Sequence, residues 1–364
     1  MYIKLSGKDG ALHRLGKEIQ NVFQNLFKQR GKWRRKALEV APYYSDAAPR
    51  ATNARKQIIC MYDGRMDHGG IADRLRGVIS AYDVAKQMGY DFRIYFDHPF
   101  RLEDYLEPNL VDWRIAKEEL CYNPEDAEAM FCGSNGTWVE PFFQRLWFKK
   151  RFREANKQLH VYTNALLLPR SKRYGELFQE LFRPSARLEQ ALDAQLQHIV
   201  TSHHITNLKS QTSNLKPQIS NLKPHYITIS LRFIGLLDDF TERDGKHIAP
   251  EEQQRLMDRC VAKIRELYDQ RAQGKPVLLT SDSTRFLRYA AERLDFVRYI
   301  PGDVVHIDYQ DATSDDINMK LFVDMLMISR ADEAFLLQTG GMYNSGFPRR
   351  AAQITGIPFH HVRF

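Results

Sequence analysis

The stretch that decides the fold is C-terminal. It reads Leu321-Phe-Val-Asp-Met-Leu-Met-Ile-Ser329, Glu333-Ala-Phe-Leu-Leu337, Gln338-Thr-Gly-Gly-Met-Tyr-Asn-Ser-Gly346 and Phe347-Pro-Arg-Arg-Ala-Ala-Gln353. These segments predict an amphipathic helix, a short buried strand, a small-residue turn and the start of a second helix. Backbone N–H groups at a helix start have no partner inside the helix, so this turn is a candidate anion site. An ordinary strand-to-helix connection is an equally good interpretation of the turn alone.

Strands and helices alternate along two parts of the chain, which predicts an α/β fold with parallel sheets. The first series is a strand at 56–61, a glycine turn at 63–70, a helix at 72–88 and a strand at 91–96. The second series precedes the C-terminal segments and consists of a strand at 226–232, a helix at 250–273, a strand at 276–280, a helix at 283–294 and a strand at 303–307. We therefore expect two doubly wound, Rossmann-like domains that face a cleft, in which ligands bind at the carboxyl ends of the strands.

A heptad repeat separates the two series. The tripeptide Asn-Leu-Lys begins at Asn207, Asn214 and Asn221. Pro217 and Pro224 interrupt any helix there, and only leucine recurs as an apolar residue, so we predict a flexible linker rather than a coiled coil. The predicted organisation is a basic arm at 1–55, an acceptor-side α/β domain at 56–200 that ends with a polar helix at 184–198, the linker at 201–225 and a nucleotide-sugar-binding α/β domain at 226–364. The histidines beside the repeat, His198, His203 and His204, are interpreted as an accidental cluster rather than a metal site.

The composition is that of a water-soluble globular protein. The chain has 364 residues, of which 43% are hydrophobic and 27% charged, and it contains no apolar run of the roughly 20 residues that a bilayer span needs. We find no secretory signal pattern. The four cysteines, Cys60, Cys121, Cys132 and Cys260, show no C-x-x-C spacing. They are expected to be reduced thiols, which favours a cytoplasmic protein.

The net charge of +8 is concentrated in the N-terminal arm. Residues 1–36 contain ten basic residues against Asp9 and Glu18, so the rest of the chain is balanced and a nucleic-acid partner is not expected. The same arm has an apolar stripe at helical spacing: Leu12, Leu15, Ile19, Val22, Phe23, Leu26 and Phe27. A basic amphipathic helix of this kind suits an anionic membrane surface, which would place the protein at the inner face of the membrane. The alternative is that the helix packs on the protein and the basic run is solvated.

Four groups of residues at expected strand ends are candidates for chemistry. The first is Gly69 and Gly70 with Asp73 and Arg74. The others are Arg232, the pair Asp282 and Ser283, and the turn Ser345, Gly346 and Phe347. A guanidinium at the end of a buried strand is costly to bury without an anion and binds phosphates in a bidentate manner. The alternatives are structural: an Arg232–Asp238 ion pair, and Ser283 as a helix N-cap.

The order and spacing of these residues resemble a known superfamily. Ser230-Leu-Arg232 with Asp239, Thr280-Ser-Asp-Ser283, and Asp324–Ser329 with Tyr343-Asn-Ser-Gly-Phe347 resemble the three donor-side motifs of the α-1,2-, α-1,6- and protein-O-fucosyltransferases. This superfamily includes the nodulation-factor fucosyltransferases of bacteria. Gly69-Gly70-x-x-Asp73-Arg74-Leu75 resembles the glycine-rich first loop of the group. The resemblance covers about residues 56–96 and 226–364.

The resemblance implies a GT-B fold, a GDP-fucose donor and inverting transfer without a metal. In that case Arg232 would hold the β-phosphate, Asp282 and Ser283 would lie near the guanine or ribose, and Ser345, Gly346 and Phe347 would contact the diphosphate. Gly69, Gly70 and Arg74 would form the first loop's share of the donor site. The chain departs from the pattern at two positions: Ser230 replaces a usual histidine, and Asp238 stands where glycine is common.

The residue chemistry agrees with such a reaction. Negative charge develops on the leaving phosphate, and a preorganised arginine and backbone N–H groups stabilise that charge in the transition state. The sequence has no Asp-x-Asp pair of the metal-dependent kind, so we expect no metal and no cofactor beyond the donor. Asp67, His68 and Asp73 are candidates for the base that accepts the proton of the acceptor hydroxyl.

The predicted function is therefore a fucosyltransferase-like glycosyltransferase of glycan biosynthesis, cytoplasmic or associated with the membrane surface. Its expected partners are a nucleotide-sugar donor and a glycan or lipid-linked glycan acceptor. The rival interpretation is a catalytically silent GT-B module that binds a nucleotide or glycan, or a transferase that uses another nucleotide sugar. The dinucleotide-binding pattern G-x-G-x-x-G is absent, which argues against a dehydrogenase.

Overall fold

The computed structural model describes residues 35–51, 55–133, 140–168, 172–207, 225–240, 247–272 and 274–364. The chain divides into two compact units, each described by itself. Unit 1 comprises residues 1–69, 73–98 and 112–171, and unit 2 comprises residues 70–72, 99–111 and 172–364. Within the described ranges no helix has both the length and the apolar character that a bilayer crossing requires. Residues 1–34 and 208–224, which carry most of the predicted basic arm and linker, lie outside the described residues.

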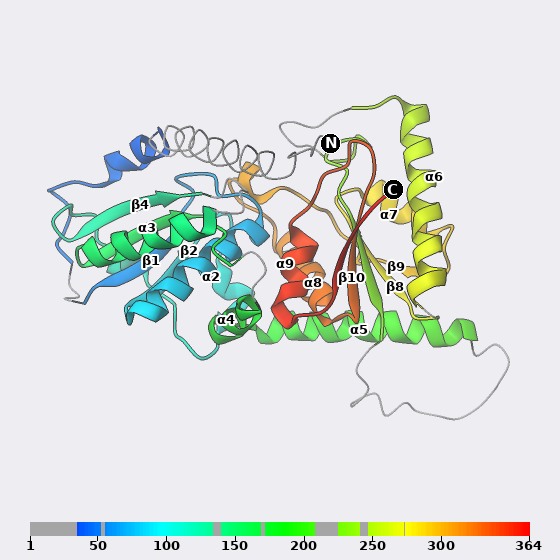
Figure 1. The fold of residues 1–364 in the computed structure, drawn as a ribbon, viewed down its shortest axis with the longest axis horizontal. Coiled ribbons are helices and arrows are strands. Elements are labelled where there is room, and N and C mark those ends of the chain that lie inside the picture. The colour runs from blue at the N-terminus through cyan, green and yellow to red at the C-terminus, as the bar shows by residue number, and fades with distance from the viewer. Residues whose placement is uncertain are drawn as a thin grey trace, which may run out of the picture. The chain divides into compact units, whose positions relative to one another are not determined.

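Unit 1 is built on a four-stranded parallel sheet in the order β2-β1-β5-β4. The strands and their connecting helices are β1 (Gln57–Tyr62), α2 (Ile71–Met88), β2 (Asp91–Phe96), β4 (Ala127–Cys132), α3 (Glu140–Glu154) and β5 (Gln158–Thr163). Parallel neighbours need a crossover connection, and α2 and α3 supply it. The two helices lie side by side over the sheet, joined by an ion pair of 2.6 Å between Arg145 and the buried Asp83 (Figure 1).

Residues 35–40 are helical and cover the other face of this sheet. Val40 is fully buried in a cluster with Ile59 and Met61, which alternate along β1 with residues that face the helices on the opposite side. The Tyr44 hydroxyl, which follows the short helix η1 (Ala41–Tyr43), lies 2.6 Å from Nδ1 of His160. The described end of the predicted arm therefore packs on unit 1.

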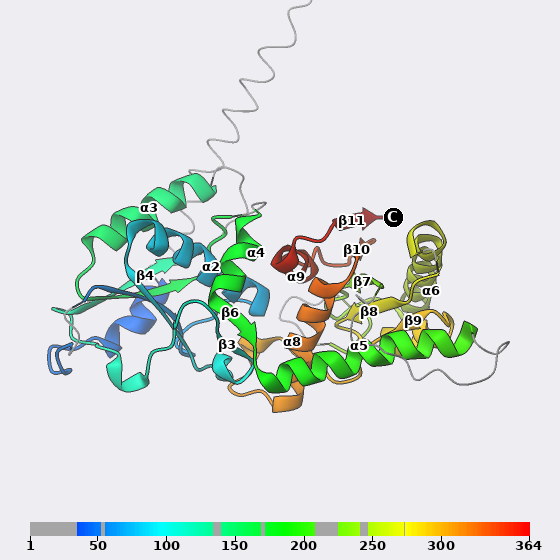
Figure 2. The same cartoon turned by 90° about the horizontal axis from the view of Figure 1, so that it is seen from below.

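Unit 2 is built on a five-stranded parallel sheet in the order β11-β10-β7-β8-β9. Its strands are β7 (Ile227–Leu231), β8 (Val277–Ser281), β9 (Val297–Arg298), β10 (Glu333–Gln338) and β11 (Phe359–Arg363). Its helices in this region are α6 (Pro250–Leu267), the π-helical η4 (Tyr268–Ala272), α7 (Thr284–Ala291), η5 (Ile307–Tyr309), α8 (Asp315–Arg330) and α9 (Phe347–Thr355). Helices α6 and α7 lie on one face of the sheet and α8 and α9 on the other (Figures 1 and 2).

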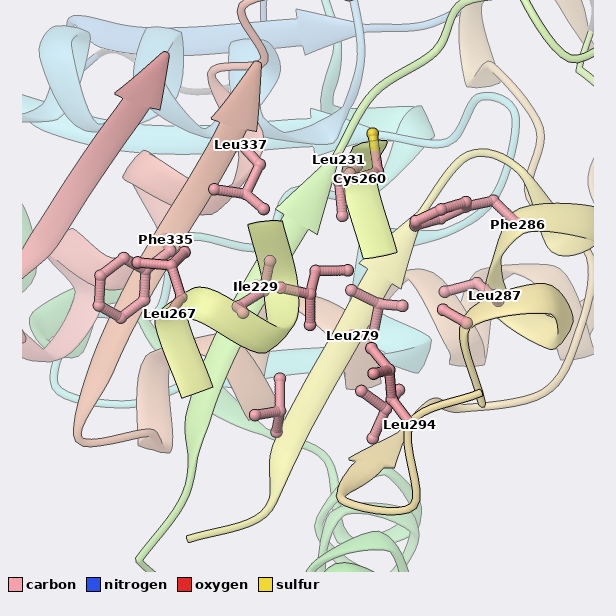
Figure 3. Packing of buried hydrophobic residues seen from close by; sticks show 14 of the residues in the cluster. Ile229, Leu231, Cys260, Leu267, Leu279, Phe286, Leu287, Leu294, Phe335 and Leu337 are labelled. Carbon is pink, nitrogen blue, oxygen red and sulfur yellow. The ribbon is translucent and has the colours of Figure 1, made fainter. Parts of the chain in front are cut away.

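The core of unit 2 shows why the strands are nearly continuous in apolar residues. Ile229 and Leu231 of β7 and Leu279 of β8 point toward Cys260 and Leu267 (Figure 3). A parallel strand is buried on both faces, and the burial of these side chains contributes most of the stabilising free energy of such a layer. The predicted α/β class with two Rossmann-like sheets is confirmed.

The domain boundary differs from the sequence prediction. Helix α4 (Arg173–Leu181), β6 (Phe182–Pro184) and α5 (Ala186–Asn207) belong to unit 2, although the sequence assigned residues 56–200 to the first domain. Strand β6 pairs antiparallel with β3 (Leu106–Pro108), and the neighbouring Tyr105 ring stacks on Phe322 of α8 at 4.9 Å. Glu189 of α5 pairs with Arg330 of α8 at 2.7 Å. These contacts explain why residues 99–111 and the segment from 172 belong to unit 2, where β3 and β6 form a separate two-stranded sheet.

Three predicted elements also need correction. The predicted polar helix at 184–198 runs on to Asn207, so the first residues of the predicted linker at 201–225 are helical, since no proline or glycine stops the helix before that point. The helix predicted to Gln273 ends as an α-helix at Leu267. The strand predicted at 303–307 is absent: β9 comes earlier, at Val297–Arg298, and the predicted segment runs into η5, which begins at Ile307.

Candidate functional site

Arg232 follows β7 at the carboxyl edge of the unit 2 sheet. Its Nε atom lies 3.4 Å from Oδ2 of Asp282, and its guanidinium lies 4.6 Å from the centre of the Phe240 ring. The Arg232 side chain is 22% exposed, whereas that of Asp282 is 1% exposed. The guanidinium is thus held in a fixed position on a ring and a carboxylate while part of it still reaches solvent.

Asp282 organises the backbone of the loop that carries Arg232. Its Oδ1 accepts the N–H of Phe233 and its Oδ2 the N–H of Ile234, both at 2.8 Å. Ile234 has φ of +47°, a left-handed conformation that a β-branched residue rarely adopts. Burial raises the pKa of Asp282, and the Arg232 charge and the two N–H donors oppose this shift. The Asp282 carboxylate therefore fixes the backbone conformation of the loop after β7.

Ser283 is the N-cap of α7, so the structural alternative for this residue is confirmed. Its Oγ accepts the N–H of Phe286 at 3.0 Å and donates to Oδ2 of Asp239 at 2.9 Å. The same Asp239 oxygen accepts the N–H of Arg285 at 2.8 Å. The buried hydroxyl and the first turn of the helix are both satisfied within the protein.

The structural alternative for Arg232, an ion pair with Asp238, is not formed: Arg232 pairs with Asp282. Asp238 instead meets Nδ1 of His247 at 2.6 Å and Nε2 of Gln253 at 2.5 Å, and these two hydrogen bonds lower its pKa. Asp238 has φ of +61°, a region that glycine adopts at little cost. This backbone conformation is consistent with the glycine that the resembling family often has at this position.

The turn before α9 lies next to Arg232. The Tyr343 N–H donates to the carbonyl oxygen of Arg232 at 2.9 Å, which ties the end of β7 to the start of the turn. Gly346 is the N-cap residue of α9, is exposed, and has no side-chain cap. A Cβ atom added to Gly346 would meet nothing within 4 Å, so the backbone is open there. The Ser345 hydroxyl accepts the Phe347 N–H at 3.3 Å.

The two departures from the family pattern are accommodated locally. Ser230, where the family has a histidine, is buried, and its hydroxyl lies 2.7 Å from that of Thr280. This bond links β7 to β8 directly behind Arg232. Nothing in the sequence pattern indicates that Thr280 and Phe240 support Arg232, although Phe240 directly follows Asp238 and Asp239.

The glycine loop of unit 1 precedes α2. Gly69 has φ of +90°, and a Cβ atom there would lie 2.5 Å from Oδ2 of Asp73, whereas Gly70 faces open space. Arg74 is buried and donates to the carbonyl oxygens of Gly69 at 3.1 Å and His98 at 2.6 Å. Arg74 therefore holds the loop in place from inside, which differs from the donor contact expected of it.

The three candidate bases have different surroundings. His68 is 2% exposed and lies between the rings of Tyr62 and Tyr162, with centroids 4.6 and 6.0 Å away. Asp73 is paired with Arg76 at 2.7 Å, but its side chain is 38% exposed. Asp67 is exposed, and its backbone carbonyl accepts Nζ of Lys36 at 2.7 Å.

An open cleft of about 410 Å³ lies beside the start of α7. It is lined by Asp239, Thr284, Arg285, Arg288, Tyr289 and Glu292. Among the described residues no group of three or more histidine, cysteine, aspartate or glutamate side chains is arranged to hold a metal ion. The side chains of His203 and His204 lie outside the described residues.

The fold is similar to that of solved glycosyltransferase structures. NodZ alpha-1,6-fucosyltransferase soaked with GDP-fucose matches at a TM-score of 0.51 and 14% identity, over 82% of this chain and 92% of that chain. The same enzyme co-crystallised with GDP matches at 0.50 and 13%, and the selenomethionine form of fucosyltransferase NodZ from Bradyrhizobium at 0.51 and 14%, with the same coverage. No protein-family model and no curated protein sequence matches the chain. The similarity shows that the chain has the GT-B fold of these structures, as the sequence resemblance implied.

Proposed function

We propose that this chain is an inverting, metal-independent glycosyltransferase that transfers fucose from GDP-fucose to a glycan hydroxyl. One observation supports the proposal: the backbone N–H of Tyr343 bonds to the backbone carbonyl of Arg232, so the residue that carries the guanidinium adjoins the turn that leads to the start of α9. These two features are the cationic and the N–H donor groups that a diphosphate leaving group requires. The comparison with NodZ in its GDP-fucose and GDP forms supports this choice of donor.

The chain's own residues supply the following roles in the proposed reaction. Arg232 binds the β-phosphate with two parallel N–H bonds, and its contacts with Asp282 and Phe240 fix its direction. The Gly346 N–H and the Ser345 hydroxyl receive the remaining phosphate oxygens, whereas the N–H groups of Ser345 and Phe347 bond to the Tyr343 carbonyl and the Ser345 hydroxyl and hold the turn in shape. As the bond between fucose and phosphate breaks, charge grows on this phosphate, and donors that are already in place stabilise it without reorganisation.

For the acceptor side we propose that Asp67 or Asp73 accepts the proton of the hydroxyl. Both carboxylates reach solvent, whereas the buried ring of His68 does not. Gly69 and Gly70 allow a ligand to approach the backbone at the start of α2. Asp73→Asn and Asp67→Asn variants distinguish the two carboxylates. The variant that lacks the base has a lower kcat, while its Kd for the donor is unchanged.

The test of the proposal is a thermal-shift screen of GDP, UDP, ADP and NAD in the presence of EDTA, followed by an assay for fucose transfer. A ligand at 100 times its Kd stabilises the native state by about 2.7 kcal/mol. We expect GDP alone to raise the melting temperature without metal. Stabilisation only by UDP contradicts the proposed GDP-fucose donor. Stabilisation only with Mg²⁺ or Mn²⁺ contradicts the proposed metal-independent mechanism. Binding of GDP and GDP-fucose without transfer to any glycan would support the silent module.

A further inference from the structure

Helix α3 of unit 1 has large apolar side chains on its outer face. Phe142 is 64%, Phe143 49%, Leu146 52% and Trp147 43% exposed. The helix is anchored to unit 1 by a different set of residues, since Glu140, Gln144, Phe148 and Phe152 are its buried positions. The exposed residues recur at i, i+1, i+4 and i+5, which places them on one side of two successive turns.

Phe142, Phe143, Leu146 and Trp147 form one contiguous apolar patch on the surface of α3. The described residues contain nine exposed large hydrophobic side chains, and four of them are these neighbours on α3. The rings of Phe142 and Phe143 meet edge to face at 5.5 Å. Single exposed apolar residues need no explanation, but a contiguous group on a helix marks a surface that binds something apolar.

The turns that follow the patch are basic. Helix α3 contains the basic residues Arg145, Lys149, Lys150, Arg151 and Arg153 against the acidic Glu140 and Glu154. Arg145 and Arg151 are paired with Asp83 and Glu128 of the same unit, at 2.6 and 2.5 Å. Lys150 and Arg153 are exposed, and the contact between Lys150 and Glu154 is long, at 3.8 Å. The exposed end of the helix therefore presents cationic groups next to an aromatic face.

We propose that α3 is a docking surface for an anionic lipid bilayer. Phe142, Phe143, Leu146 and Trp147 enter the boundary between headgroups and acyl chains, and Lys149, Lys150 and Arg153 contact the lipid phosphates. Aromatic side chains favour this boundary, and basic residues are attracted by the surface potential of anionic lipids. The binding does not depend on the proposed transfer reaction.

The positive charge of α3 favours an anionic bilayer over a second copy of the chain or the N-terminal arm as its partner. A second copy of the chain would bring an equally basic helix against α3, and the N-terminal arm, with ten basic residues in positions 1–36, would do the same. Like charges at close range oppose both contacts. An anionic surface is the partner that complements the aromatic and the cationic parts of the helix together.

The first experiment is co-sedimentation of the full chain with vesicles of phosphatidylcholine alone or with phosphatidylglycerol added. We expect binding only to the anionic vesicles. The double variant Phe143→Ser/Trp147→Ser should weaken binding about 10-fold or more, because two large apolar side chains no longer leave water. Leu110→Ser is the matched control, since Leu110 is 76% exposed but lies in unit 2. Unchanged binding by the double variant overturns the proposal.

The second experiment separates α3 from the N-terminal arm. In a full-length Trp33→Phe/Trp138→Phe background the remaining tryptophans are Trp147 and Trp113, which is 1% exposed. We expect vesicles to shift the Trp147 emission to the blue and brominated lipids to quench it. Vesicle binding without quenching would show that another part of the chain binds the membrane. A lipid-free dimer that the Phe143→Ser/Trp147→Ser variant converts to a monomer would identify an interface between copies instead.

Discussion

Nε of Arg232 lies 3.4 Å from Oδ2 of Asp282, and that carboxylate also accepts the N–H groups of Phe233 and Ile234. One buried side chain from the end of β8 thus fixes both the side chain and the backbone of the loop after β7. The left-handed Ile234 costs roughly 1–2 kcal/mol, and the two charge-assisted hydrogen bonds offset that cost. The folded loop therefore orients Arg232 before any ligand binds.

The first prediction concerns the geometry of the Arg232 guanidinium. Arg232→Lys keeps the positive charge but loses the two parallel N–H groups, so we expect kcat to fall by roughly 10²–10³ while the protein stays folded. Steady-state kinetics with GDP-fucose and calorimetric unfolding measure the two effects. Arg271→Lys is the control, because Arg271 pairs with Glu333 at the start of β10, away from the carboxyl edge. Near-normal turnover of the Arg232→Lys variant would show that Arg232 has only a structural role, as the ion-pair partner of Asp282.

The second prediction tests whether Asp282 positions Arg232. Asp282→Asn preserves the shape of the side chain but replaces one acceptor oxygen with an NH₂ group, which faces a backbone N–H donor. We expect the free energy of unfolding to drop by about 1–3 kcal/mol. The Kd for GDP should rise roughly 10-fold, since Arg232 loses its anionic partner. Isothermal titration calorimetry measures the Kd. A stable variant that binds GDP normally would show that the loop holds Arg232 by other contacts.

Helices and strands were predicted well from the sequence where their pattern of apolar and polar side chains is strong. The alternation of apolar runs and turn residues placed β1, α2, β2, β7, β8 and β10 to within about two residues. The motif residues Arg232, Asp282 and Tyr343 also meet at one edge of the sheet, as parallel strands require. A short strand such as β9 has only Val297 and Arg298, too few residues to give a periodic signal.

What the sequence did not reveal depends on contacts distant along the chain. The assignment of residues 172–207 to unit 2 rests on pairs such as Glu189 with Arg330 and on the stacking of Tyr105 against Phe322. No local pattern encodes such pairs. The buried position of Arg74 was missed for the same reason, because its partner His98 comes from the loop after the next strand. An arginine beside a glycine turn has the same sequence signature whether it binds a ligand or the protein's own carbonyls.

The third prediction separates the structural from the donor-binding role of Ser283. Ser283→Ala removes the N-cap of α7 and the bond to Asp239, which should lower the free energy of unfolding by about 0.5–2 kcal/mol. We expect the KM for GDP-fucose to stay unchanged, because the hydroxyl already donates to Asp239 and accepts from Phe286. Ser314→Ala, which removes the N-cap of α8, is the control for the loss of a cap. A higher KM with full stability would place the Ser283 hydroxyl on the donor.

The fourth prediction is a pH dependence of unit 1. Burial lowers the pKa of His160 to about 3, and the Tyr44 hydroxyl donates to Nδ1 of the neutral ring at 2.6 Å. In the unfolded chain the same ring has a pKa of about 6.5, so between these values the unfolded state holds a proton that the folded state lacks. The stability that His160 contributes is therefore present above about pH 6.5 and is lost as the pH falls toward 3, by up to about 1.4 kcal/mol per pH unit.

The comparison of His160→Gln with Tyr44→Phe tests this dependence. In the Trp33→Phe/Trp138→Phe background the remaining Trp113 and Trp147 lie in unit 1, so their fluorescence during urea unfolding reports on that unit. His160→Gln removes the titrating ring, and its destabilisation relative to the wild type should shrink steadily as the pH is lowered below about 6.5. Tyr44→Phe removes the same hydrogen bond but keeps the buried ring, so its stability should fall with acid as steeply as that of the wild type. Equal acid sensitivity of the wild type and His160→Gln would show that other groups control the acid unfolding of unit 1.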